Sequence, residues 1–128
     1  MARAVFDASA VVAVLGDEPG AALLAGYAGD ALISAVNLQE VVTIMLRRGA
    51  ADDAARKMIA GLRLEVRAHG AADAYAAADL HAATKVFGAG LGDHSCIALA
   101  ISENLPALTT DRTWAKLAIA GLKVIVAR

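Results

Sequence analysis

Residues 3–16 read RAVFDASAVVAVLG, and this stretch decides the fold. Arg3–Phe6 is a short apolar run that predicts a strand, and Ser9–Leu15 predicts a helix that ends near Gly16. Asp7 stands at the junction between them. A carboxylate at the end of a buried apolar strand costs free energy unless it has partners, so Asp7 indicates a function more strongly than any other acid in the chain.

The rest of the chain continues this alternation of strand and helix. Further strands are predicted at Ala31–Ser34, Leu64–Arg67, Ala107–Thr109 and Lys123–Val126. Further helices are predicted from Pro19 to Ala28 and at Asn37–Arg48, Ala51–Leu62, Ala72–Phe87, Asp93–Asn104 and Trp114–Ala120. This alternation predicts an α/β fold, with a central parallel sheet covered by helices on both faces. Right-handed crossovers place all the strand C-terminal ends at one edge, where ligands bind in such sheets.

Length and composition limit the classes of protein to consider. The 128 residues suit one domain spanning 1–128, and a hydrophobic content of 59% is enough for a packed core. No run approaches the roughly 20 apolar residues of a membrane span, and Asp7 interrupts any signal-like segment at the N-terminus. We therefore expect no membrane segment and a cytoplasmic location.

Net charge and cysteine content further limit the kinds of binding site that the chain can form. A formal net charge of −1 argues against broad binding of polyanions, so any contact with nucleic acid must come from a local patch or a bound metal ion. The single cysteine, Cys96, excludes an intramolecular disulfide and a cysteine-based zinc cluster. We interpret Cys96 as a small buried apolar side chain.

Four acids from distant parts of the chain are predicted at the same edge of the sheet. Asp7 and Asp111 follow strands, whereas Glu40 and Asp93 lie in the first turns of predicted helices. Four carboxylates in one pocket repel each other unless a cation neutralises them. Mg²⁺ and Mn²⁺ prefer such oxygen ligands, and one or two ions would also offset the charge of a phosphate and activate water.

Each of these acids also has a purely structural interpretation. Asp93 suits the N-cap of a helix, Asn37-x-x-Glu40 has the spacing of a capping box, and Asp111 suits a turn. Four structural residues that converge on one edge by coincidence are less probable than a single site. We therefore favour a shared metal site.

Four segments resemble the motif blocks of PIN domains, and most closely those of the bacterial VapC toxins. They occur in the family's order and cover the whole chain: Val5–Ala10 (VFDASA), Ile33–Val41 (ISAVNLQEV), Leu91–Ala100 (LGDHSCIALA) and Leu108–Ala115 (LTTDRTWA). The resemblance implies a three-layer α/β/α fold with a central parallel sheet. It also implies a ribonuclease that uses Mg²⁺ or Mn²⁺ to hydrolyse RNA, with tRNA or ribosomal RNA as the expected substrate.

The resemblance also implies roles for particular residues. Asp7, Glu40, Asp93 and Asp111 take the places of the family's metal-binding, catalytic acids, and Ser9 and Thr109 those of the supporting hydroxyls. Some relatives carry a further acid where this chain has Thr113, which leaves the number of ions open at one or two. His94 stands where relatives often have arginine or a small residue, and we interpret it as a partly exposed helix histidine. The implied partners are an RNA substrate, a second copy in a homodimer, and a VapB-type antitoxin whose tail enters the active site.

Several basic and aromatic residues are candidates for contact with RNA. Arg112 is the strongest, because it follows Asp111 directly, and Trp114 is better explained by core packing than by base stacking. The other candidates for phosphate contact are Arg47, Arg48 and Lys85.

Other readings of the acids fit less well. A receiver-type signalling domain needs paired acids near the first strand, and an aspartyl phosphatase needs Asp-x-Asp where this chain has Asp7-Ala8-Ser9. Two alternatives within the family stay open: an RNA-processing nuclease without an antitoxin, and a catalytically silent RNA-binding module. An antitoxin reading frame just upstream would separate the toxin from the processing nuclease.

Overall fold

The computed structural model describes all 128 residues and contains one five-stranded sheet in which every neighbouring pair of strands is parallel. Its order, β3-β2-β1-β4-β5, puts β1 at the centre, so the direction of strand progression reverses beside β1. Ligands bind at such switch points, beyond the C-terminal ends of the strands. The strands are β1 (Ala4–Phe6), β2 (Ala31–Ser34), β3 (Glu65–Arg67), β4 (Ala107–Thr109) and β5 (Val124–Val126).

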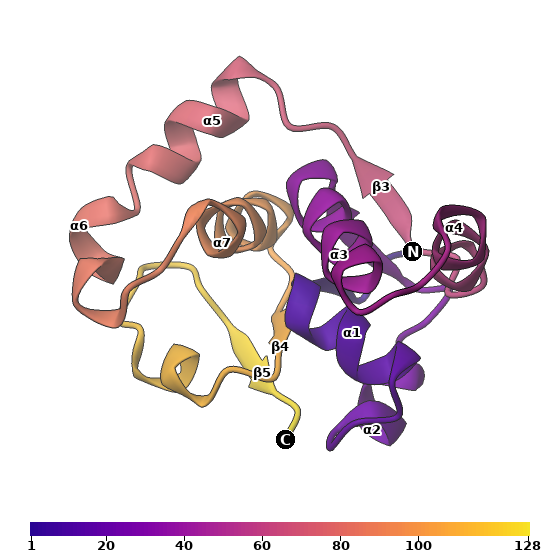
Figure 1. The fold of residues 1–128 in the computed structure, drawn as a ribbon. Coiled ribbons are helices and arrows are strands. Elements are labelled where there is room, and N and C mark those ends of the chain that lie inside the picture. Colours follow the sequence, from indigo (N-terminus) through magenta and orange to yellow (C-terminus); the bar gives the residue numbers. More distant parts are fainter.

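Helices cover both faces of the sheet, as Figure 1 shows. Because side chains alternate along a strand, Phe6 and Ile33 pack into one apolar cluster and Val5 and Leu32 into the other. The first cluster is completed by α1 (Ala8–Leu15), α2 (Ala21–Ala25), α3 (Ala35–Arg47) and α4 (Asp52–Ala60), and the second by α7 (Leu91–Glu103) and the 3₁₀ turn η2 (Arg112–Lys116). This arrangement confirms the predicted three-layer α/β/α fold.

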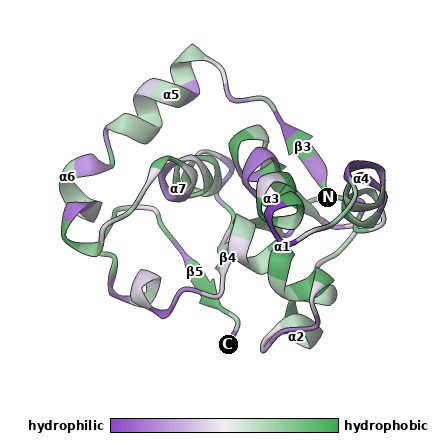
Figure 2. Cartoon of the chain, viewed as in Figure 1, coloured by the Kyte–Doolittle hydropathy of each residue, from purple (hydrophilic) through white to green (hydrophobic).

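The hydrophobicity of each helix follows its position. Figure 2 shows α1 as largely hydrophobic, and five of its eight residues are buried against the sheet. The α4 helix at the periphery is mainly hydrophilic in the same view and buries only Ala55 and Ile59. The predicted burial of Cys96 and Trp114 in the core is confirmed, with exposed fractions of 0% and 3%. No helix is long and apolar enough to cross a membrane.

The single helix predicted over Ala72–Phe87 is wrong. The segment forms α5 (Ala71–Ala78), then α6 (His81–Thr84) and the 3₁₀ turn η1 (Lys85–Phe87), which run along the outer edge of the molecule (Figure 1). Thr84 is fully buried, and its hydroxyl donates to the Leu80 carbonyl at 2.9 Å. A hydroxyl that bonds the backbone in this way competes with regular helical geometry at the end of α6, where the chain passes into η1.

The last predicted helix, Trp114–Ala120, is also replaced by a shorter element. Only η2 forms, and the Asp111 carboxylate caps it by accepting from the Thr113 amide at 2.9 Å. After η2 the backbone becomes extended at Leu117. Leu117 and Ile119 then pack against the second apolar cluster, an arrangement that a continued helix would not allow. The predicted helix after Pro19 is likewise reduced to the five residues of α2.

Gly20 brings the start of α2 against the C-terminal segment, and we expect Gly20→Ala to destabilise the fold strongly. Gly20 has φ +95, and a Cβ there would lie 2.0 Å from the carbonyl oxygen of the buried Ala127. Left-handed strain and overpacking each cost about 1–3 kcal/mol. Urea denaturation of the variant measures the sum as a lower free energy of unfolding.

Gly49→Ala is the matched control, because Gly49 has φ +94 and nothing lies within 4 Å of the added Cβ. Gly49→Ala introduces backbone strain alone. The difference in the free energy of unfolding between the two variants therefore measures the contact with Ala127. Equal losses of stability in the two variants would contradict the close approach at Gly20.

Candidate active site

Asp7 lies at the C-terminal end of the central strand, as the sequence predicts. It is only 4% exposed and caps α1, because its Oδ1 accepts from the Ala10 amide at 2.8 Å. The Ser9 hydroxyl donates to the same carboxylate at 2.7 Å, and the Thr109 hydroxyl donates to Oδ2 at 2.5 Å. Three donors therefore fix the orientation of this buried carboxylate.

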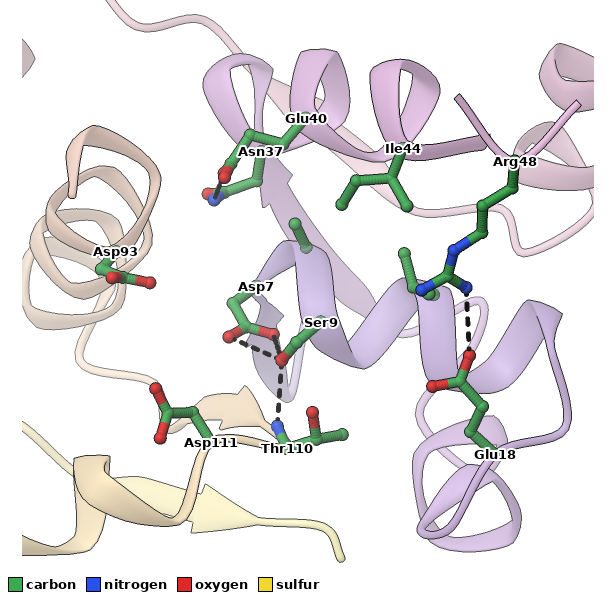
Figure 3. Close-up of a pocket in the computed structure, with 12 residues that line it drawn as sticks. Asp7, Ser9, Glu18, Asn37, Glu40, Ile44, Arg48, Asp93, Thr110 and Asp111 are labelled. Atoms are coloured by element: carbon green, nitrogen blue, oxygen red, sulfur yellow. Dashed lines mark hydrogen bonds and ion pairs between the residues drawn. The ribbon is translucent and has the colours of Figure 1, made fainter. Parts of the chain in front are cut away.

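The two supporting hydroxyls also join β1 to the end of β4. Ser9 accepts from the Thr110 amide at 3.0 Å (Figure 3). Thr109 accepts from the Asp111 amide at 3.0 Å. Each hydroxyl thus donates to Asp7 and accepts from the backbone that leads to Asp111. The arrangement places Asp7 and Asp111 at the same edge and puts Ser9 beside Asp7, as expected, while Thr109, expected only as the hydroxyl before Asp111, also contacts Asp7.

Glu40 projects from α3, but not from its first turn. The helix begins at Ala35, two residues earlier than predicted, because the Ser34 hydroxyl caps it by accepting from the Val36 amide. The capping-box interpretation of Asn37 and Glu40 is therefore wrong. Instead, Asn37 Nδ2 donates directly to Glu40 Oε1 at 2.9 Å. Glu40 is half-buried, so this interaction holds it at the rim of the pocket.

Asp93 lies on α7, which begins at Leu91 rather than at Asp93. The N-cap is Gly90, whose amide donates to Asp93 Oδ2 at 3.1 Å. The N-cap interpretation of Asp93 is therefore wrong in position, although the carboxylate does satisfy an amide at the helix start. A negative charge in the first turn is also favoured by the helix dipole.

Asp111 is exposed at the opposite side of the site, and Thr113 holds it. The Thr113 hydroxyl donates to Asp111 Oδ1 at 2.8 Å, and the Thr113 amide donates to the same oxygen at 2.9 Å. The residue that stands where some relatives carry a further acid is thus a hydrogen-bond donor in this chain. It orients Asp111 and adds no negative charge.

The four acids line one pocket of about 310 Å³, which we call the acidic pocket. In Figure 3, Asp7, Asp93 and Asp111 point toward a shared space, while Glu40 is turned toward Asn37. The pKa of Asp7 is raised to about 6, mainly by burial and slightly by the nearby Asp93, against the lowering effect of the hydrogen bonds from Thr109, Ala10 and Ser9. Burial also raises the pKa of Glu40 and of Asp93, and a neighbouring carboxylate adds to the rise in both.

The donor set fits a hard divalent cation, because the pocket offers carboxylate oxygens whose negative charges are costly there. As the side chains stand, no three His, Cys, Asp or Glu side chains lie close enough together to hold one ion. An ion would therefore have to draw the carboxylates inward. The raised pKa of three of them shows that neutralising positive charge would be favourable.

His94 is buried, which corrects the interpretation of a partly exposed histidine. It is 8% exposed, and its Nε2 lies 2.7 Å from the Thr84 hydroxyl. This interaction ties α7 to α6 and satisfies both buried groups. His94 thus serves the packing between these helices.

The basic residues predicted to contact RNA lie in different places around the site. Arg48 lines the acidic pocket, where it pairs with Glu18 at 3.4 Å. Arg47 lines a second hollow of about 570 Å³ between α3 and the start of α7, the α3–α7 groove, which shares Glu40 and Asp93 with the acidic pocket. Arg112 is exposed beside Asp111, and Lys85 is exposed on η1.

Three residues at the site were missed by the reasoning from sequence. Glu18 lines the pocket from the segment after α1, and Asn37 lines it from α3. Gly92 lies under Glu40, since a Cβ on Gly92 would be 1.8 Å from Glu40 Oε1. The sequence offered one signal for this cluster, the spacing of Asn37 and Glu40, which we had explained as a cap.

A comparison with family models finds a match to the PIN domain over residues 4–120. No curated protein matches the chain. Among solved structures, it is similar to DNA-bound VapBC from Salmonella typhimurium, with 18% identity, a TM-score of 0.74 and full coverage of both chains. It is also similar to a toxin–antitoxin complex from Klebsiella pneumoniae (17% identity, TM-score 0.74, 98% of each chain) and to a VapBC-family member from Mycobacterium tuberculosis (21%, 0.59, 98% and 99%).

Proposed function

This chain belongs to the PIN-domain family, and on that premise we propose that it is a divalent-metal-dependent endoribonuclease that acts as the toxin of a VapBC-type toxin–antitoxin pair. The observation that carries the proposal is the environment of Asp7. Asp7 is buried at the switch point of the sheet, is held by three donors, and faces a pocket that Glu40, Asp93 and Asp111 also line.

In this proposal the four acids would hold one or two Mg²⁺ or Mn²⁺ ions. A bound ion would supply charge neutralisation for the phosphate and the leaving oxygen, and would lower the pKa of water. Asp7 or Asp93 would orient the attacking water in line with the bond to the 3′ oxygen. Breaking that bond leaves a 5′-phosphate and a 3′-hydroxyl, and the reaction requires no covalent enzyme intermediate and no 2′-hydroxyl.

Cleavage of total RNA by the purified chain tests this activity. We expect discrete products with Mg²⁺ or Mn²⁺, none with EDTA, and 5′-phosphate ends at each cut. Products that carry a 5′-hydroxyl and a 2′,3′-cyclic phosphate would exclude the proposed attack by water. Binding without any cleavage, by folded protein freed of partners, would favour the silent RNA-binding module.

The toxin role is supported by the structural similarity to proteins described as VapBC or toxin–antitoxin complexes. We expect expression of the chain alone to arrest growth, and co-expression of a VapB-type protein encoded beside it to restore growth. Arrest that no neighbouring gene relieves would instead favour the RNA-processing nuclease without an antitoxin.

A homodimer is the proposed assembly. Three large apolar side chains, Tyr75, Val86 and Leu91, are 76–84% exposed, and they lie on α5, on η1 and at the start of α7. Exposed apolar side chains of this size commonly mark a surface that another chain covers. Sedimentation of the purified protein tests the assembly, and a monomer at micromolar concentration would contradict it.

The position of Arg47 leads to a prediction about the path of the RNA. Arg47 has no ion-pair partner and faces the α3–α7 groove, whereas Arg48 is paired with Glu18. We expect Arg47→Ala to weaken RNA binding and to reduce the slope of log affinity against log salt by about 1. Filter binding with the Asp7→Asn protein, which leaves the RNA intact, measures both quantities.

Arg56→Ala is the control for this prediction, because Arg56 pairs with Asp52 on the exposed surface of α4. It removes the same charge and should leave RNA affinity unchanged. Equal weakening in both variants would mean that only net charge matters and that the groove does not carry the RNA.

A further inference from the structure

Asn37 is a buried polar side chain that connects the two helices carrying Glu40 and Asp93. It is only 1% exposed. Its Nδ2 donates to Glu40 Oε1 at 2.9 Å on its own helix, and to the carbonyl oxygen of Gly92 at 2.9 Å on α7. Both amide protons are therefore used: one bonds Glu40 beside the acidic pocket (Figure 3), and the other joins α3 to the start of α7.

The orientation of this amide leaves its oxygen without a partner. Asn37 Oδ1 is buried and accepts no hydrogen bond from any group in the protein. A buried acceptor left in this state costs free energy, and most buried polar groups avoid it. An apolar side chain of similar size would fill the same space without that cost. The two hydrogen bonds donated by Nδ2 are therefore what favours asparagine over an apolar residue at this position.

The backbone at Gly92 also restricts Glu40. A Cβ on Gly92 would lie 1.8 Å from Glu40 Oε1 and 2.3 Å from its Cδ, so the carboxyl group rests directly against the backbone of α7. Gly92 is also the residue before Asp93. Asn37 and Gly92 therefore limit where Glu40 can lie relative to the adjacent acid.

We propose that Asn37, together with Gly92, is a positioning residue that sets the Glu40 carboxylate against Asp93 for cation binding. The proposal rests on the proposed metal-dependent function and deepens it. Asn37 does not touch the ion or the substrate in this account. It acts through Glu40, and its loss releases the Glu40 carboxylate from its fixed position at the rim of the pocket against Gly92.

Calorimetric titration of Mn²⁺ into folded protein tests the proposal. Asn37→Ala and the nearly isosteric Asn37→Leu should each weaken Mn²⁺ binding by about 10–100-fold, as is typical for residues that orient metal ligands. Gly92→Ala keeps the amide but displaces Glu40, and should weaken binding to a similar extent. Asn104→Ala is the matched control, because Asn104 ends α7 far from the acids and its loss affects stability alone.

A double-mutant cycle with Glu40→Gln then separates positioning from general destabilisation. If Asn37 acts through Glu40, Asn37→Leu should have little further effect on Mn²⁺ affinity once Glu40 has been changed. Full additivity of the two losses would overturn the proposal, as would wild-type affinity in the folded Asn37→Leu and Gly92→Ala proteins. Absence of Mn²⁺ binding by the wild-type chain is a different result, which would overturn the proposed metal-dependent function itself.

Discussion

Asp7→Asn is expected to abolish RNA cleavage while leaving the protein folded. Asparagine keeps the shape of aspartate, and its Oδ1 can still cap α1 by accepting from the Ala10 amide. The substitution removes the central negative charge of the pocket. We expect the single-turnover rate to fall by more than the roughly 10–100-fold that loss of a supporting residue around a metal costs.

Ser9→Ala is the reference for this effect. Ser9 donates to Asp7 at 2.7 Å but has no charge, so its loss disturbs the orientation of the carboxylate and leaves the carboxylate in place. The single-turnover rate of Ser9→Ala should fall by the roughly 10–100-fold that is typical of a supporting residue. If Asp7→Asn loses no more activity than Ser9→Ala, Asp7 is not the central ligand that the account requires.

The second large effect concerns stability and pH. Because burial raises the pKa of Asp7 from an ordinary 3.8 to about 6, the charged form costs the folded state about 3 kcal/mol. Well below pH 4 both the folded and unfolded states hold the proton, and the cost vanishes. As pH rises from about 4 through 6, the unfolded chain loses its proton first, so this contribution to the free energy of unfolding falls.

The metal-free protein should therefore gain about 1–2 kcal/mol from Asp7 between pH 7.5 and pH 5. Glu40 and Asp93 contribute in the same direction, because burial raises the pKa of each. The comparison is made by urea denaturation of wild type and Asp7→Asn at both pH values, in EDTA. The wild type should gain more on acidification than the variant, and an equal gain would contradict the raised pKa of Asp7.

Exposed Asp53 supplies the matched control, because Asp53→Asn removes a carboxylate on α4 outside the pocket. It should keep the wild-type dependence on pH.

Mn²⁺ at 100 times its dissociation constant should add about 2.7 kcal/mol to the free energy of unfolding of the wild type at pH 7.5, and much less to that of Asp7→Asn.

Asp7 and Asp111 could be located from the sequence because each follows a short apolar strand. In a parallel sheet this position alone brings a residue to the C-terminal edge, whatever the details of the connecting helices. The registers of β1 against β2 and β4 then place these ends together. The fold class and the positions of two of the four acids therefore followed from the alternation of strands and helices along the chain.

The helix positions were harder to predict, because caps depend on side chains that also have other roles. Ser34 ends β2 and caps α3, so the helix begins before the apolar pattern becomes clear. At α7, Gly90 leaves the cap to be completed by Asp93, three residues later. Both acids were placed on the correct helices, but Glu40 lies one turn later than predicted, whereas Asp93 is in the first turn as expected.

The contacts between helices could not be predicted from local sequence patterns. Asn37 meets Gly92, 55 residues away, and nothing near Asn37 in sequence indicates that α7 lies beside it. The buried His94 contacts Thr84, at the end of α6, in the segment where a single helix was predicted over 72–87. These positions follow from packing between elements rather than from the pattern of any one of them.

The location of a bound cation tests the central claim most directly. Crystals of the protein soaked in Mn²⁺ and measured at the manganese absorption edge should show an anomalous peak in the acidic pocket. We expect that peak within coordination distance of Asp7 and of at least one of Glu40, Asp93 and Asp111, and no such peak in Asp7→Asn crystals. A protein that cleaves RNA with Mn²⁺ but binds the ion elsewhere, or leaves this pocket empty, would contradict the account.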